Sequence, residues 1–245
     1  MNDMNDYKYI GTVYRYLGLV ELNNQNWSNA QDFFIKALDF HQKAEWRPAF
    51  ETTTLFLGLA YYYDEKYDLA EKFITKAVQI TERRTNTSFY GKTAKVIQMM
   101  LHSKLDKCTV EDIDSLVDSI EKESLTPTKE SGPIKREYWY ISQCYLNLGL
   151  NDKSEKYKKL AYDDMIRLSE YIEDEKIRTD YLELPLLHRK IRGDNLIDKE
   201  SSDSIEDLSP TEEEIADVFL FCPSCGFNNE NKFKFCPQCG AALSS

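Results

Sequence analysis

Four cysteines near the end of the printed sequence have the spacing of a metal site. Cys222 and Cys225 form one Cys-x-x-Cys pair, and Cys236 and Cys239 form a second pair after ten intervening residues. Four thiolates within tetrahedral reach select zinc, and four such ligands leave no open position for catalysis. We therefore expect one structural zinc ion in residues 221–245, a segment too short to fold on an apolar core of its own.

Each cysteine pair contains a proline after its first cysteine and is followed by a glycine. Pro223 and Pro237 restrict the turn, while Gly226 and Gly240 can adopt positive φ, so that backbone N–H groups point at the sulfurs. This doubled Cys-Pro-x-Cys-Gly resembles the short double-knuckle zinc ribbon found at the ends of many bacterial and archaeal proteins. The resemblance implies a docking module for protein or, through the two lysines of residues 232–234, for nucleic acid; we favour protein.

The rest of the chain shows no arrangement of reactive residues. His41, His102 and His188 are scattered, no glycine pair has the spacing of a phosphate-binding loop, and no Gly-x-Ser-x-Gly is present. The many carboxylates fall where solvent-facing helix positions are expected. We expect a protein that is not an enzyme and has no small-molecule substrate.

Small and large apolar residues recur at the spacing of two helices packed as a hairpin. The residues that define this pattern are Leu57, Gly58, Tyr61, Ala70, Ile74 and Ala77. The same pattern fits around Gly18, which precedes Gly58 by 40 residues, and fits more loosely around Ser142. Gly18 and Gly58 are small where two helices must cross closely, so the fold class predicted is all-α.

A further hairpin should lie between the second unit and the unit around Ser142. An apolar-periodic stretch passes through Val96 and Leu101, and Thr109 to Asp112 resembles a helix start before Ile113. Pro48 suits the first turn of a helix, and Pro185 should end a long helix that begins near Ser154. The sequence thus predicts about four hairpins.

This pattern resembles the tetratricopeptide repeat over roughly residues 7–175. The resemblance implies a right-handed helical solenoid whose concave groove holds a peptide or helix from another protein. Carrying over the outward positions of the first helix of each repeat gives these groove residues: Arg15, Leu19, Asn23, Leu55, Tyr62, Tyr63, Trp139, Gln143 and Asn147. Tyr62 and Tyr63 could instead pack against neighbouring hairpins. The paired lysine and asparagine pattern that clamps a C-terminal carboxylate is not present.

Charge divides the chain into three parts. Residues 1–192, the repeat domain, hold 28 basic and 31 acidic side chains, whereas residues 193–220 hold one and ten. The second segment lacks apolar periodicity, so we expect an acidic flexible linker before the zinc ribbon of residues 221–245. No apolar run approaches a membrane span, and the N-terminus shows no leader, which favours a cytoplasmic location without membrane partners.

These expectations favour a scaffold or signalling regulator that binds a protein partner in its groove. Two alternatives remain open. The first is a nucleic-acid adaptor that uses the zinc ribbon. The second is a regulatory fragment of a larger signalling protein, because the first hairpin lacks a helix to cover it and because the string from Tyr181 to Ile191 is similar to the ends of repeat arrays in such proteins.

Overall fold

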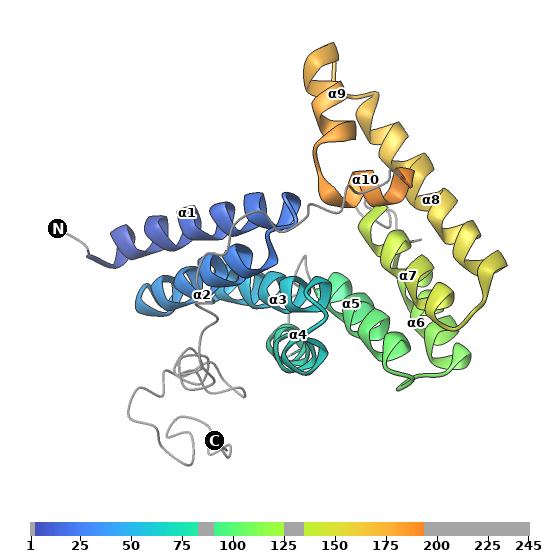
Figure 1. Cartoon of the computed structure of the whole chain (residues 1–245), viewed down its shortest axis with the longest axis horizontal. Coiled ribbons are helices and arrows are strands. Elements are labelled where there is room, and N and C mark those ends of the chain that lie inside the picture. Colours follow the sequence, from blue (N-terminus) through green and yellow to red (C-terminus); the bar gives the residue numbers. More distant parts are fainter. Residues whose placement is uncertain (1–2, 83–90, 125–134, 194–245) are drawn as a thin grey trace. The chain divides into compact units, whose positions relative to one another are not determined.

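The computed structural model describes residues 3–82, 91–124 and 135–193, and all regular elements in these ranges are helices (Figure 1). They are α1 (Asp3–Asn23), α2 (Trp27–Lys43), α3 (Arg47–Tyr63), α4 (Tyr67–Glu82), α5 (Gly91–Lys104), α6 (Val110–Ser124), α7 (Lys135–Asn147), α8 (Asn151–Ser169), α9 (Glu175–Glu183) and α10 (Leu186–Arg192). The predicted all-α class is confirmed for this part of the chain. None of these helices is long and apolar enough to cross a membrane.

The helices fall into two compact units, which hold α1–α4 and α5–α10. In the first unit α1 packs on α2, α2 on α3, and α3 on α4. The predicted close crossings are present in both hairpins. A Cβ added to Gly18 would lie 2.6 Å from the ring of Phe34, and one added to Gly58 would lie 2.7 Å from Ile74. Because Phe34 and Ile74 are also 40 residues apart, the two hairpins repeat one packing geometry.

The second unit is built on the α7–α8 pair, against which α6, α9 and α10 pack. The predicted helix start before Ile113 is confirmed: the Thr109 N–H donates to Asp112 Oδ2 at 2.8 Å, and the Asp112 N–H donates to Thr109 Oγ1 at 3.3 Å. These reciprocal bonds form a capping box that satisfies N–H groups left open at a helix start.

The single helix expected from Ser154 to about residue 183 is wrong. It divides into α8 and α9, because the chain turns after Ser169 and Asp174 caps a new helix by accepting from the Ile177 N–H at 2.8 Å. The Arg178 guanidinium donates to the Ile172 carbonyl oxygen at 2.6 Å and holds the turn. Pro185 follows the end of α9, as predicted.

One turn geometry recurs at five helix ends. In each turn, a residue in the left-handed region is followed by a residue whose N–H donates to the carbonyl oxygen five positions earlier in the chain. The donors are Asn26, Trp46, Lys66, Lys107 and Leu150. The left-handed residues are Gln25, Glu45, Glu65, Asp106 and Gly149. This is the Schellman arrangement, which satisfies carbonyls left open at a helix end. Four of the turns, at residues 25, 65, 106 and 149, close hairpins, so the period of about 40 residues is present in the backbone itself.

Candidate partner-binding surface

The predicted groove residues of α1 are all partly exposed. Arg15, Leu19 and Asn23 lie one helical turn apart, which places them along one side of the helix. The guanidinium of Arg15 lies over the ring of Tyr16, 4.8 Å from its centroid, and its Nε has no hydrogen-bond partner among the described residues. This side of α1 therefore offers an accessible aliphatic side chain between a cation and an amide.

The groove residues of α3 differ in exposure. Leu55 is 1% exposed and cannot be reached from a groove, so we do not retain it as a contact residue. Tyr63 stacks on Trp27 with ring centroids 5.4 Å apart, as the alternative of packing predicts. Tyr62 packs edge-on against Tyr63 and Tyr67 and keeps part of its ring exposed. Tyr62 is thus the best placed of the three for a partner.

The groove residues of α7 are largely engaged within the second unit. Trp139 is only 8% exposed, which also removes it from the contact set. The Asn147 amide donates to Ser103 Oγ at 3.0 Å, and the Gln143 amide donates to Ser142 Oγ at 3.2 Å. Gln143 and Asn147 remain partly exposed, so α7 offers a polar surface rather than an aromatic one.

Two side-chain hydrogen bonds join α5 to α7. Thr93 Oγ1 donates to a carboxylate oxygen of Glu137 near the start of both helices, and Asn147 bonds Ser103 near their ends. Each pair is 44 residues apart, so α5 and α7 run parallel, as do first helices of successive hairpins. Glu137 is 4% exposed and its other oxygen has no partner among the described residues, and burial raises the pKa of this carboxyl.

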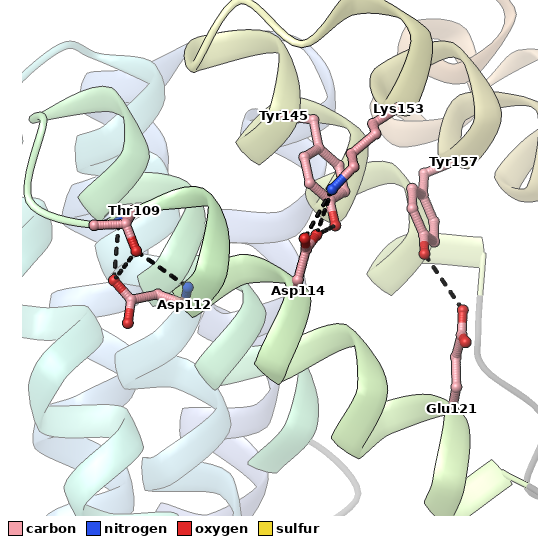
Figure 2. Close-up of polar contacts among 7 residues, drawn as sticks. All are labelled: Thr109, Asp112, Asp114, Glu121, Tyr145, Lys153 and Tyr157. Atoms are coloured by element: carbon pink, nitrogen blue, oxygen red, sulfur yellow. Dashed lines mark hydrogen bonds and ion pairs between the residues drawn. The ribbon is translucent and has the colours of Figure 1, made fainter.

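Asp114 joins α6 to the α7–α8 hairpin (Figure 2). Its Oδ1 accepts from the Tyr145 hydroxyl at 2.6 Å and from Lys153 Nζ at 2.8 Å, and these donors hold the pKa of Asp114 below its usual range. Tyr157 donates to Glu121 Oε1 at 3.4 Å and stacks on Tyr145 at 5.5 Å. In the first unit, burial and then the nearby Asp32 raise the pKa of Tyr61 to about 12. The Tyr61 hydroxyl has no hydrogen-bond partner among the described residues, so the hydrogen bond between Tyr145 and Asp114 has no counterpart there.

Sequence patterns did not predict that His41, on α2, is buried against α1 beside Gly11. His41 is fully buried, neither ring nitrogen has a hydrogen-bond partner among the described residues, and its ring meets Trp46 edge-on at 5.4 Å. Burial first, and then the positive charge of Arg15, lower the pKa of His41 to about 4. The ring is therefore neutral at pH 7 and acts as a packing residue.

The predicted zinc ligands Cys222, Cys225, Cys236 and Cys239 lie outside the described residues. Across residues 3–82, 91–124 and 135–193, no group of three or more histidine, cysteine or acidic side chains could hold a metal ion. Cys108 and Cys144 are free thiols, and burial raises the pKa of both. Zinc binding remains a prediction of residues 221–245.

Comparison with known proteins adds nothing to these observations: no family model, no curated protein and no solved structure matches the chain.

Proposed function

We propose that this chain is a non-catalytic interaction scaffold of the tetratricopeptide-like kind, which binds a peptide or helix of another protein along the first helices of its hairpins. The observation that carries the proposal is the repeated hairpin geometry: one turn at four hairpin ends, and one glycine crossing 40 residues apart. Stacked helical repeats generate extended surfaces of this kind and commonly serve as binding surfaces.

The proposed contact set is smaller than the one predicted from sequence, because Leu55 and Trp139 are buried and Tyr63 stacks on Trp27. In the first unit it contains the partly exposed side chains of α1 and α3, namely Arg15, Leu19, Asn23 and Tyr62. In the second unit it contains Gln143 and Asn147 of α7. A cation, several amides and an aromatic ring suit a peptide with a carboxylate and an apolar anchor, since arginine and tyrosine carry much of the energy in protein interfaces. The zinc ribbon is proposed as a second docking module, joined through the acidic segment.

The test purifies three forms of the full chain from the source cell and compares how much partner protein each form retains. The first is unchanged, the second carries Leu19→Ala and Tyr62→Ala, and the third carries Lys36→Ala and Gln79→Ala at exposed positions of α2 and α4. The proposal predicts a partner retained by the first and third forms and reduced at least tenfold in the second. Equal retention by all three forms, with helicity unchanged, would contradict it.

A further inference from the structure

One face of α1 is apolar and uncovered among the described residues. We call it the α1 stripe, and it consists of Tyr9, Ile10, Val13, Tyr16, Leu17 and Val20. Their exposed fractions run from 38% for Ile10 to 69% for Tyr9. Six large apolar side chains within three helical turns form a contiguous patch, and a patch of this kind usually marks an interaction surface. The stripe lies beside the proposed partner side of α1 and was not predicted as a site.

The corresponding face of the next first helix, α3, shows what kind of element covers such an apolar face. The residues 40 positions later, on α3, are Ala49, Phe50, Thr53, Phe56, Leu57 and Ala60. All except Phe56 are at most 6% exposed, and α3 packs on α2. The rings of Phe34 on α2 and Phe56 on α3 lie 6.0 Å apart. Because the α1 stripe occupies the corresponding positions, its natural occupant is an amphipathic helix lying as α2 lies on α3.

Residues 209–221, outside the described residues, have the sequence pattern of an amphipathic helix. Their first residues, Ser209-Pro-Thr-Glu212, match the sequence pattern of a capping box with proline at the first helical position. Apolar residues then follow at helical spacing as Ile215, Val218 and Phe219. We call residues 209–221 the terminal segment. It occupies the end of the stretch expected to be an acidic linker and leads directly to Cys222.

Length and charge match the terminal segment to the α1 stripe. Twelve helical residues span about 18 Å, and the stripe also extends over twelve positions, from Tyr9 to Val20. A helix of this length is marginal in water, so it needs a surface to pack on. Residues 7–20 of α1 carry two basic side chains, Lys8 and Arg15, and no acidic one, which suits the acidic residues 212–214 and 217 of the segment. The acidic residues of α1, Asp3, Asp6 and Glu21, lie beyond the ends of the stripe. Covalent attachment through residues 194–208 raises the effective concentration to the millimolar range.

We propose that the terminal segment folds as a helix on the α1 stripe of its own chain and closes the exposed end of the first hairpin. This contact does not depend on the proposed function. It places the zinc ribbon next to the start of the repeat domain, and it makes the acidic stretch a tether between two attached modules.

The test is amide hydrogen exchange of the full chain with zinc bound. Ile215→Asp with Phe219→Asp should raise exchange in α1 at least tenfold, because the stripe loses its cover. The control Ile205→Asp with Leu208→Asp introduces the same two charges before the segment and should leave exchange in α1 unchanged. Zinc content is measured for each variant, so that damage to the ribbon is recognised. Unchanged α1 exchange in the double variant overturns the proposal.

Light scattering determines whether the terminal segment or a second copy of the chain covers the α1 stripe. We expect a monomer at all concentrations for the unchanged chain. A dimer that Val13→Asp dissociates, while Ile215→Asp with Phe219→Asp does not, would show that a second copy covers the stripe and would overturn the proposal.

Discussion

At the scale of single residues, the recurring turn explains why some positions are strained and one is not. Gln25, Glu45, Glu65 and Asp106 have φ between 50° and 65°, a region that costs a residue with a side chain roughly 1–2 kcal/mol. Gly149 takes the same place at φ 74° without that cost. A Cβ added there would meet nothing within 4 Å, so the backbone alone decides the effect of a substitution.

Glu65→Gly should therefore stabilise the first unit by about 0.5–1 kcal/mol, the strain removed less the added freedom of glycine in the unfolded chain. Gly149→Ala should destabilise the second unit by about 1 kcal/mol. Denaturant melts followed by helix circular dichroism measure both changes. If both substitutions shift stability in the same direction, the turn geometry described for these positions is not the controlling factor.

His41 predicts a dependence of stability on pH. Its pKa is lowered from 6.5 to about 4 by burial and by Arg15, so the folded state favours the neutral ring. That stability is fully present above pH 6.5 and is lost as the pH falls toward 4, by up to about 3 kcal/mol from 1.36 kcal/mol per pKa unit. His41→Phe keeps an aromatic ring against Trp46 and removes the titration.

The measurement compares the unfolding midpoints of the unchanged chain and of His41→Phe at pH 7 and pH 4.5. The unchanged chain should lose more stability between these two conditions than the variant does. Equal losses would mean that the ring is charged or solvated in the folded state, contrary to its complete burial.

At the scale of elements, side-chain pairs decide how neighbouring helices are held. Thr93 is the donor to Glu137 Oε1, and the carboxyl is buried. Thr93→Val should destabilise the second unit by about 2 kcal/mol, because an acceptor that can be charged is left buried without this donor. Thr93→Ser keeps the hydroxyl and serves as the control.

Chemical denaturation at pH 7 measures the free energy of unfolding of both variants. Repeating the measurement at lower pH should distinguish a lost hydrogen bond from a lost packing contact. Since burial already raises the pKa of Glu137, protonation at lower pH should recover part of the loss in Thr93→Val. A loss that stays constant with pH, or that Thr93→Ser shares in full, would assign the effect to packing.

Some features of these elements could be predicted from the sequence, and one could not. Gly18, Gly58 and the capping box at Thr109 were predictable, because crossing distance and helix starts depend on local residue types. The break between α8 and α9 was not, since the stretch from Ser169 to Asp174 contains no glycine or proline. Its geometry depends on the bond between Arg178 and the Ile172 carbonyl, which apolar periodicity does not encode.

The candidate site was predictable only in part, for a related reason. Position within a repeat indicates which way a side chain points, but neighbouring helices decide whether it stays accessible. Leu55 and Trp139 occupy outward positions of the pattern and are nevertheless buried. The α1 stripe shows the opposite case: the sequence predicted that the first hairpin lacks a covering helix, but it did not single out the α1 side chains that are exposed as a result.

At the scale of the whole molecule, the zinc prediction can be tested without disturbing the helices. Chain purified under reducing conditions should contain about one zinc per molecule, and Cys236→Ser with Cys239→Ser should abolish it. The structural metal supplies roughly 10 kcal/mol or more of folding free energy to such a segment, so its removal should unfold residues 221–245. The helical circular dichroism signal should fall only slightly, because α1–α10 do not contain these ligands. A large loss of helix after chelation would contradict the separation of the two modules.

The most direct test of the scaffold account is site-specific photo-crosslinking in the source cell. A photoreactive residue at Leu19 or Tyr62 lies on the proposed partner surface, and one at Gln79 lies on the exposed side of α4. The account predicts the same protein adduct from positions 19 and 62, and no such adduct from position 79. Adducts confined to position 79, or nucleic acid in place of protein at 19 and 62, would contradict the claim that first-helix side chains of the hairpins bind a protein partner.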